Sequence, residues 1–294
     1  MANKRRKKKN RLIPILLVIV LALILALLVK CAVSRLRPDD NTGIFQDIWI
    51  EVPDGEGSTF LVKKADSLEK NTLTEDAFYS SGDYIYYDGD EYTALQGVDV
   101  SFYQGDIDWE QVRAAGISFA MIRAGYRGYQ SAAIQVDEKF YQNLNGALAA
   151  GLDVGVYFYS QAVTPEEARE EANLVLQLIE GYDISFPIAF DWEHISDDTA
   201  RTDDIHSDVL TDCCLAFCDT IRNAGYDPIV YFYRSLGYHE YEMDRLKGLD
   251  FWFSGTGAYP DYYYEIAMWQ YSYTATVPGI STNTDLNLYF IKNE

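Results

Sequence analysis

Apolar and polar positions alternate in two different periods from residue 96 onward. Eight short runs have the β-branched, aromatic and alternating character of strands, and between several of them the apolar residues recur every three to four positions, as on one face of a helix. The predicted strands are residues 97–102, 118–124, 153–160, 186–193, 228–234, 250–255, 266–272 and 285–291. The predicted helices are residues 109–115, 137–150, 165–180 and 206–224.

Eight strands alternating with helices in about 200 residues are typical of a closed (β/α) barrel of the TIM type. The alternative is an open, doubly wound sheet. That fold usually has a glycine-rich phosphate loop after its first strand, and residues 97–109 contain none. The connections between the last strands are too short for full helices, so the sequence predicts an irregular barrel over residues 96–294.

The N-terminal part of the chain has a different character. Residues 12–29 form an 18-residue apolar run, which as a helix would span about 27 Å. Seven basic residues precede it, so we predict a transmembrane signal anchor at 12–30 with a cytoplasmic tail at 1–11. A cleaved signal peptide is the alternative, although the run is long and no Ala-x-Ala site follows closely. Lys30 makes lipid attachment at Cys31 unfavourable.

Residues 31–95 connect this anchor to the barrel and contain many turn-forming residues, so we predict a stalk with a small β appendage. Phe60-Leu61-Val62 has the character of a short strand. Residues 84–87 and 91–94 flank Asp88-Gly89-Asp90, a pattern that predicts a hairpin. The tyrosine-rich segment Tyr259–Tyr264 has two interpretations: an aromatic rim that contacts a ligand, or side chains that pack at the surface.

Charge and cysteine content narrow the possible partners. Ten of the 24 basic residues precede Asp39, so the remaining 14 face all 45 acidic residues, a formal charge of −31. Such a body does not bind nucleic acid through its phosphates and suits an uncharged substrate such as glycan. Cys213, Cys214 and Cys218 share one predicted helix, where buried, reduced thiols are expected. An exported domain without disulfides indicates a bacterium, of the Gram-positive type. The sequence does not indicate an oligomeric state.

Two acidic residues end the fourth predicted strand. Asp191 and Glu193 are one residue apart, so their side chains share a face at a backbone separation of roughly 6–7 Å. Paired carboxyl groups at the end of a buried strand suit acid-assisted glycoside cleavage, because burial and mutual repulsion keep one protonated while the other is ionised. The alternative is an acidic strand end that faces solvent.

The other strand ends favour a site over that alternative. In a barrel the carboxyl ends of the strands converge on one mouth. The candidate side chains there are acids, amides and aromatic rings that suit sugar hydroxyls and ring faces: Asp99, Arg123, Tyr157, Tyr159, Tyr231, Trp252, Trp269, Gln270 and Asp285.

Several of these residues lie in motifs that resemble glycoside hydrolase family 25, the bacterial and phage muramidases sometimes called Chalaropsis-type lysozymes. The motifs occur in order along residues 96–294, and residues 1–95 lie outside the resemblance. They are Gly97-Val98-Asp99-Val100-Ser101-Phe102-Tyr103-Gln104-Gly105, Phe119-Ala120-Met121-Ile122-Arg123-Ala124, Gly155-Val156-Tyr157-Phe158-Tyr159, Asp191-Trp192-Glu193, Met268-Trp269-Gln270-Tyr271 and Asp285-Leu286-Asn287.

The resemblance implies hydrolysis of the β-1,4 bond between N-acetylmuramic acid and N-acetylglucosamine in peptidoglycan. It makes Glu193 the proton donor and Asp191 its assistant, which either orients the substrate 2-acetamido group or stabilises developing positive charge. Asp99 and Asp285 are the other acids of the implied site, and Tyr157 is a substrate-binding tyrosine. No cofactor or metal is implied. Retention and inversion at the anomeric carbon both remain open.

Combined with the anchor, the resemblance predicts a single-pass membrane protein whose barrel faces the cell wall outside. Two other functions remain: a glycan-binding scaffold that has lost turnover, and a hydrolase of another amino-sugar polymer. The three histidines, His194, His206 and His239, do not have the spacing of metal ligands.

Overall fold

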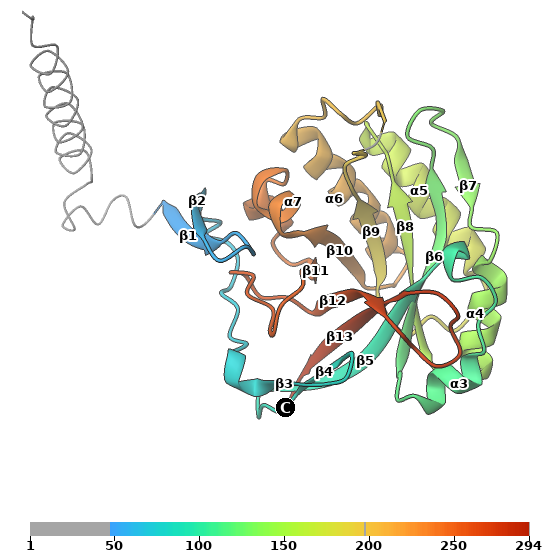
Figure 1. The fold of residues 1–294 in the computed structure, drawn as a ribbon. Coiled ribbons are helices and arrows are strands. Elements are labelled where there is room, and N and C mark those ends of the chain that lie inside the picture. The colour runs from blue at the N-terminus through green and yellow to red at the C-terminus, as the bar shows by residue number, and fades with distance from the viewer. Residues whose placement is uncertain (1–47, 197, 294) are drawn as a thin grey trace, which may run out of the picture. The chain divides into compact units, whose positions relative to one another are not determined.

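The computed structural model describes residues 48–196 and 198–293 (Figure 1). The chain divides into two compact units after Ile50, and the barrel belongs to the unit that begins at Glu51. The predicted tail at 1–11, the predicted anchor at 12–30 and Cys31 lie outside the described residues. Within those residues, no helix is both long and apolar enough to cross a membrane.

Eight strands close into a barrel, and all eight correspond to predicted strands. They are β5 (Tyr92–Val100), β6 (Phe119–Arg127), β8 (Asp153–Ser160), β9 (Ile188–Trp192), β10 (Pro228–Tyr233), β11 (Asp250–Ser254), β12 (Met268–Ala275) and β13 (Thr284–Lys292). Each pairs with the next in this order, and β13 pairs back with β5. The pairs are parallel except those made by β13, which is antiparallel to both β12 and β5. The barrel prediction is confirmed.

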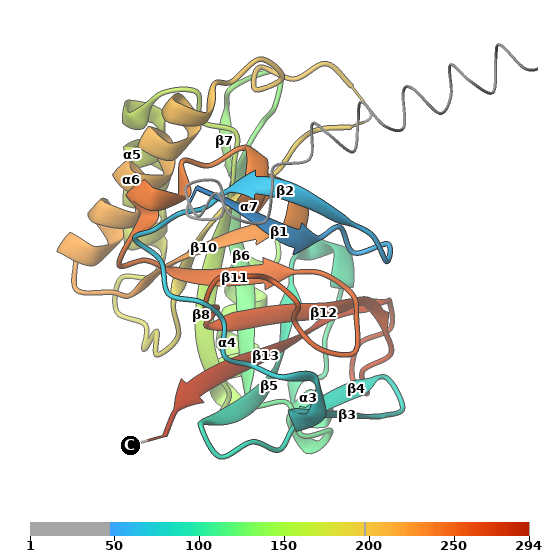
Figure 2. The same ribbon diagram turned by 90° about the vertical axis from the view of Figure 1, so that its left-hand side faces the viewer.

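Helices cover the outside of the barrel between the earlier strands (Figure 1). The four predicted helices are α3 (Trp109–Ala114), α4 (Phe140–Ala149), α5 (Pro165–Leu178) and α6 (Ser207–Asn223), and a short α7 (Arg234–His239) follows β10. Helices α5 and α6 pack side by side (Figure 2). In the described chain only loops link β11 to β12 and β12 to β13, as the short connections predicted. The described residues also contain three 3-10 turns: η1 (Glu75–Ala77), η2 (Phe102–Gln104) and η3 (Met243–Leu246).

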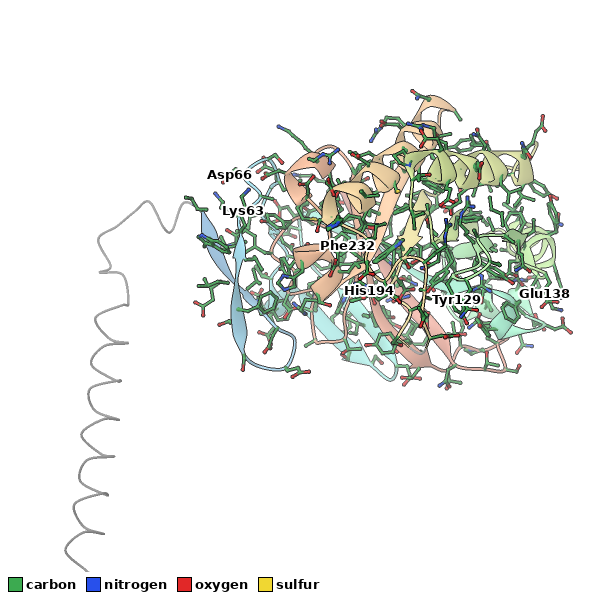
Figure 3. All side chains as sticks on the ribbon, turned by 90° about the horizontal axis from the view of Figure 1, so that it is seen from above. Lys63, Asp66, Tyr129, Glu138, His194 and Phe232 are labelled. Carbon is green, nitrogen blue, oxygen red and sulfur yellow. The ribbon has the colours of Figure 1, made fainter. Side chains whose placement is uncertain are left out.

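Strand alternation separates two apolar layers, and side chains fill the space between the backbone elements (Figure 3). Inside the barrel, Met121, Ala189 and Met268 belong to one buried cluster. Outside it, side chains of the other parity pack under the helices, as where the rings of Phe190 and Phe217 lie 5.4 Å apart. Because both faces of the strands are buried, the filled interior supports a rigid mouth at one end.

Between Glu51 and β5 the chain packs on the outside of the barrel. Strands β1 (Trp49–Pro53) and β2 (Thr59–Lys63) pair, which confirms the short strand at residues 60–62. The predicted hairpin around Asp88-Gly89-Asp90 is wrong, because β4 (Tyr84–Tyr87) pairs with the preceding β3 (Phe78–Ser81) and residues 88–91 only lead into β5. The ring of Phe78 lies against the barrel residue Trp269, at 5.7 Å.

The cysteines of α6 and two tyrosines of the 259–264 segment are buried. Cys213, Cys214 and Cys218 are buried free thiols on α6, as predicted. Tyr262 and Tyr264 are buried, and the Tyr262 ring stacks on Tyr238 at 4.5 Å. These tyrosines of the 259–264 segment are therefore packing residues and not an exposed rim.

Candidate active site

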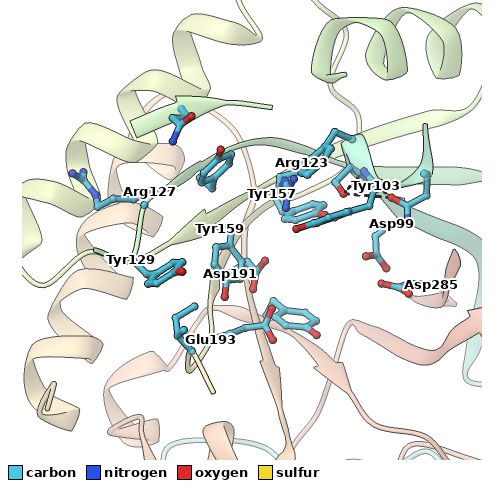
Figure 4. A pocket seen from close by; sticks show the side chains of 18 of the residues that line it. Asp99, Tyr103, Arg123, Arg127, Tyr129, Tyr157, Tyr159, Asp191, Glu193 and Asp285 are labelled. Atoms are coloured by element: carbon cyan, nitrogen blue, oxygen red, sulfur yellow. Dashed lines mark hydrogen bonds between the residues drawn. The ribbon is translucent and has the colours of Figure 1, made fainter. Parts of the chain in front are cut away.

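A pocket of about 730 Å³ opens at the mouth of the barrel, at the carboxyl ends of the parallel strands (Figure 4). Ten of the eleven predicted site residues line it: Asp99, Arg123, Tyr157, Tyr159, Asp191, Glu193, Tyr231, Trp252, Gln270 and Asp285. The eleventh, Trp269, lies elsewhere. A cavity of this size, with polar side chains converging on an aromatic floor, has the character of a ligand site.

Strand β9 places the central pair of carboxyl groups. Asp191 and Glu193 both line the pocket, whereas Trp192 between them is fully buried on the opposite face. Asp191 lies in register with Tyr159 on β8 and with Tyr231 on β10, so two tyrosines flank it. The shared face of Asp191 and Glu193 is confirmed, and the solvent-facing alternative is excluded for Asp191, which is 5% exposed.

Asp285 reaches the pocket by a route other than the predicted one. It stands at the beginning of β13, and not at a carboxyl strand end. Because β13 runs antiparallel to its neighbours, its first residues lie at the mouth, where Asp285 pairs in register with Asp99 of β5. The predicted location is therefore correct, although the reason given for it is wrong.

Asp99 and Asp285 form a pair of interacting carboxyl groups. The two groups face each other across the pocket (Figure 4), and each affects the pKa of the other. Burial raises the pKa of Asp99, although hydrogen bonds from Asn287 Nδ2 at 2.7 Å and Gln270 Nε2 at 3.0 Å oppose this rise by favouring the ionised form. Burial and the neighbouring charge of Asp99 raise the pKa of Asp285 to about 9. Asp285 is thus the proton-bearing partner at neutral pH, and Asp99 the carboxylate.

Asp191 and Glu193 form a second coupled pair. Burial, and then the charges of Glu193 and Asp99, raise the pKa of Asp191 well above its ordinary value. Burial and the charge of Asp99 raise the pKa of Glu193 to about 7. Within the described chain no donor reaches Asp191 Oδ1, although this oxygen is buried. The pair therefore holds a proton near neutral pH and keeps one carboxyl oxygen free for a donor from a ligand.

Asp285→Asn should flatten the pH dependence of stability. The folded-state pKa of Asp285, about 9, lies above its unfolded value near 4, so its proton stabilises the fold at low pH and this contribution is lost as pH rises toward 9. We expect the free energy of unfolding, measured by urea titration between pH 5 and pH 9, to decline less steeply by up to about 1.4 kcal/mol per pH unit. If the free energy of unfolding had the same pH slope in the variant and in the parent, the raised pKa of Asp285 would be contradicted.

The floor of the pocket is a connected polar and aromatic layer. Trp252 donates from Nε1 to Asn287 Oδ1 at 2.8 Å and packs edge-on against Tyr231, with ring centroids 5.0 Å apart. Tyr231 and Ser254 both donate to Gln270 Oε1, at 3.0 and 2.6 Å. Since the amide of Gln270 is fully used, its contribution here is to orient Asp99.

Trp269 corrects the predicted binding set. Neighbouring residues on a strand face opposite sides, so Gln270 faces the pocket and Trp269 faces outward. The Trp269 side chain is fully buried between Phe78 and Tyr271, and its Nε1 donates to the carbonyl of Gly255 at 2.7 Å. Trp269 therefore packs against the β3–β4 hairpin.

Trp269→Phe should therefore change stability and not substrate affinity. We expect a loss of about 1 kcal/mol in the free energy of unfolding, because the Gly255 carbonyl loses its donor while a ring still fills the site. KM should stay within about twofold of the parent, since no pocket contact is removed. A larger rise in KM, measured on soluble glycan, would restore Trp269 to the binding set.

One wall of the pocket, formed by a hairpin and a loop, was not predicted from the sequence. Strand β6 continues past its predicted end and forms a hairpin with β7 (Ile134–Val136). Pocket-lining residues from this hairpin and from the β5–α3 loop are Ser101, Phe102, Tyr103, Gln104, Tyr126, Arg127, Gly128, Tyr129, Gln130, Ser131 and Gln135. The alternating Ile134-Gln135-Val136 was the available signal for the second strand.

Arg123 connects that wall to the floor. Its guanidinium pairs with the buried Asp137 at 2.8 Å and lies over the ring of Phe102, 5.1 Å from the centroid. Asp137 also accepts a hydrogen bond from the backbone N–H of Phe102 at 3.1 Å. The ion pair thus holds the β5–α3 loop, including the exposed Tyr103, beside the carboxyl groups.

A closed barrel with four coupled carboxyl groups and aromatic walls at its mouth is the architecture of a barrel glycoside hydrolase. The family model of Glycosyl hydrolases family 25 matches residues 98–280, and the chain belongs to this family. It is 28% identical over 194 residues to the autolytic lysozyme of Clostridium acetobutylicum, an alignment that covers 66% of this chain and 55% of the relative.

Solved structures share the fold. The modular autolysin LytC of Streptococcus pneumoniae, in complex with a synthetic peptidoglycan ligand, superposes with a TM-score of 0.59 at 24% identity, over 73% of this chain and 52% of LytC. A family 25 glycosyl hydrolase of Bacillus anthracis gives a TM-score of 0.58 at 23% identity, over 71% and 94% of the two chains. The chain thus spans about half the length of the autolytic lysozyme and of LytC.

Proposed function

We propose that this protein is a muramidase that hydrolyses the β-1,4 bond between N-acetylmuramic acid and N-acetylglucosamine in peptidoglycan. The observation that supports this most directly is the pair of Asp191 and Glu193 in the mouth of a family 25 barrel, with the pKa of Glu193 raised to about 7. A carboxyl group with that pKa is partly protonated at neutral pH, as a general acid must be.

In this proposal Glu193 protonates the glycosidic oxygen as the bond from that oxygen to the anomeric carbon breaks. The developing positive charge on the sugar then lies near Asp191, which is deeper in the barrel. Water, or first the 2-acetamido oxygen of the same sugar, forms the new bond to the anomeric carbon. The ionised Asp99 adds negative potential across the pocket, which stabilises the same charge.

Substrate binding itself would place the proton on Glu193. In the free site burial raises the pKa of both Asp191 and Glu193, so the two carboxyl groups compete for a proton near neutral pH. A 2-acetamido N–H that donates to the free Asp191 Oδ1 favours the ionised form of Asp191. The resulting charge raises the pKa of Glu193, so the general acid becomes protonated when substrate is present.

Tyr157, Tyr159, Tyr231 and Arg123 complete the proposed site as binding residues, with Trp252 as its floor and Gln270 as the group that orients Asp99. We further propose that residues 12–30 anchor the protein in the membrane, that residues 1–11 are cytoplasmic and that residues 31–95 connect the anchor to the barrel outside. The apolar run and the seven basic residues before it support this orientation.

Mass spectrometry of digested peptidoglycan tests the reaction. The 38–294 fragment should release products that end in reducing N-acetylmuramic acid, and chitin oligomers in parallel identify a hydrolase of another amino sugar. Binding to peptidoglycan without any product would instead support a scaffold barrel. Cell fractionation with protease treatment of intact cells tests the anchor, which requires the barrel to be membrane-bound and accessible from outside.

A further inference from the structure

Glu193 stands one residue beyond the end of its strand. The last backbone pairings of β9 join Trp192 to Ser160 on β8 and Asp191 to Tyr231 on β10. The peptide unit between Glu193 and His194 therefore has no partner in the sheet. A peptide group that leaves the sheet beside a pocket needs other hydrogen-bond partners, and here those partners determine where the Glu193 side chain begins.

Two side chains provide them. Gln161, which directly follows the last paired residue of β8, donates from Nε2 to the carbonyl oxygen of Glu193 at 2.9 Å. The backbone N–H of His194 interacts with the hydroxyl group of Tyr233, the last residue of β10. Both polar groups of one peptide unit thus meet side chains, one just beyond the end of β8 and one at the end of β10, where backbone hydrogen bonds of the sheet would otherwise lie.

Gln161 is itself immobilised. Its side chain is fully buried, and its Oε1 accepts a hydrogen bond from Thr202 Oγ1 at 2.6 Å. Its backbone carbonyl accepts from Arg201, whose guanidinium forms two hydrogen bonds with Glu167 of α5 at 2.7 and 2.9 Å. The amide that reaches Glu193 therefore cannot change rotamer without breaking a buried network.

We propose that Gln161 and Tyr233 are positioning residues that fix the Glu193 carboxyl group in the pocket by clamping the peptide unit that follows it. This inference rests on the proposed role of Glu193 as proton donor. Neither residue lines the pocket, so both act through Glu193 and not on substrate. A displacement of a reacting group by about 1 Å can reduce a rate about 100-fold, so holding this peptide is a substantial contribution to catalysis.

The clamp also limits the exposure of Glu193, which is half-buried. Burial is the first cause of its raised pKa, so a looser peptide that lets the carboxyl group approach water should lower that pKa. Since a general acid is active only while protonated, the pH above which kcat declines should move down. A role limited to stability would leave that pH unchanged.

The test compares Gln161→Met, Tyr233→Phe and Thr202→Val in the 38–294 fragment on soluble peptidoglycan glycan. Gln161→Met keeps the side-chain length and removes the donor, and we expect kcat to fall about 10- to 100-fold with KM within about twofold. Tyr233→Phe removes one hydroxyl from a half-buried ring and should reduce kcat less, in the same direction. Thr202→Val removes the hydroxyl that holds Gln161 Oε1 but leaves the Gln161 donor in place, so it should reduce kcat in the same direction and by less than Gln161→Met.

Carbon-13 NMR titration of the Glu193 carboxyl group measures its pKa, and so tests the clamp independently of turnover. The pKa of Glu193 should decrease in Gln161→Met and in Tyr233→Phe, and by less in Thr202→Val. An active parent, with unchanged kcat and unchanged Glu193 pKa in the first two variants, overturns the clamp alone. An inactive parent overturns the proposed function, and the titration still decides whether these residues hold Glu193. If Gln161→Met does not fold, the kcat and the Glu193 pKa of Tyr233→Phe test the clamp.

Discussion

Glu193→Gln should reduce kcat on peptidoglycan by about 10²- to 10⁴-fold, the usual contribution of a general acid. Glutamine has nearly the same shape and still accepts and donates hydrogen bonds, but it has no proton to give to a leaving oxygen. Affinity for peptidoglycan, measured by co-sedimentation, should stay close to that of the parent. The melting temperature at pH 8 should be equal or higher, because the variant no longer buries a carboxyl group whose pKa is raised to about 7.

Glu138→Gln is the matched control, because Glu138 lies exposed at the surface and outside the pocket (Figure 3). Its turnover and stability should equal those of the parent. If Glu193→Gln retained more than about a tenth of the parent kcat, another acid of the pocket would be the proton donor. Asp285, with a pKa raised to about 9, would then be the next candidate.

Arg127→Met should be the most destabilising single substitution that we describe, at about 3–5 kcal/mol at pH 8. Arg127 donates from Nε to Glu171 Oε1 at 2.6 Å, and both side chains are almost completely buried. Without the guanidinium, a carboxylate remains in the interior with Ser160 as its hydrogen-bond donor. Arg127 also donates to the carbonyl of Ala132, so the β6–β7 hairpin loses its connection to α5 as well.

The pH dependence identifies the cause. Burial already raises the pKa of Glu171 to about 7 in the presence of Arg127, so in the variant Glu171 should take up a proton below neutral pH and lose most of the penalty. Urea unfolding at pH 5 and pH 8 should therefore give a smaller loss at pH 5. Arg127→Met with Glu171→Leu should recover part of the stability, since no charge remains buried.

The control for Arg127 is the same substitution at an exposed ion pair of α5. Arg169 donates to Glu166 at 3.0 Å, with half or more of each side chain exposed. Arg169→Met should change the free energy of unfolding by less than about 1 kcal/mol at either pH. A comparable loss at both sites would mean that the Arg127 effect does not come from burial.

Strand positions were predictable because each barrel strand is a short apolar run between turn residues. The start of α5 was predictable because Thr164 and Pro165 are typical of a helix N-terminus, and the Thr164 side chain accepts a hydrogen bond from the N–H of Glu167. Strand direction was not predictable, because the residues of 284–292 would suit a parallel or an antiparallel strand equally well. The segment at 84–87 was identified as a strand and given the wrong partner, since a hairpin signal follows it and the true turn at Gly82-Asp83 precedes it.

The site shows the same division between local and distant information. Spacing within one strand placed Asp191 and Glu193 on a common face, and the same rule applied to Trp269 and Gln270 would have removed Trp269 from the binding set. Gln161 carries no comparable signal. Its importance depends on where β9 ends, on the position of Thr202 and on a carbonyl 32 residues away, and only the folded chain brings these together.

The reversed direction of β13 brings the two ends of the barrel sequence together. Lys292 pairs with Tyr92, the first residue of β5, and the N–H of Asn293 donates to the carbonyl of Glu91 at 2.9 Å. These residues lie at the opposite end of β13 from Asp285, and so away from the pocket. A short linker from residue 293 to residue 91 would therefore close the barrel sequence into a circle, and new chain ends opened in a surface turn would give a circular permutant with an undisturbed mouth.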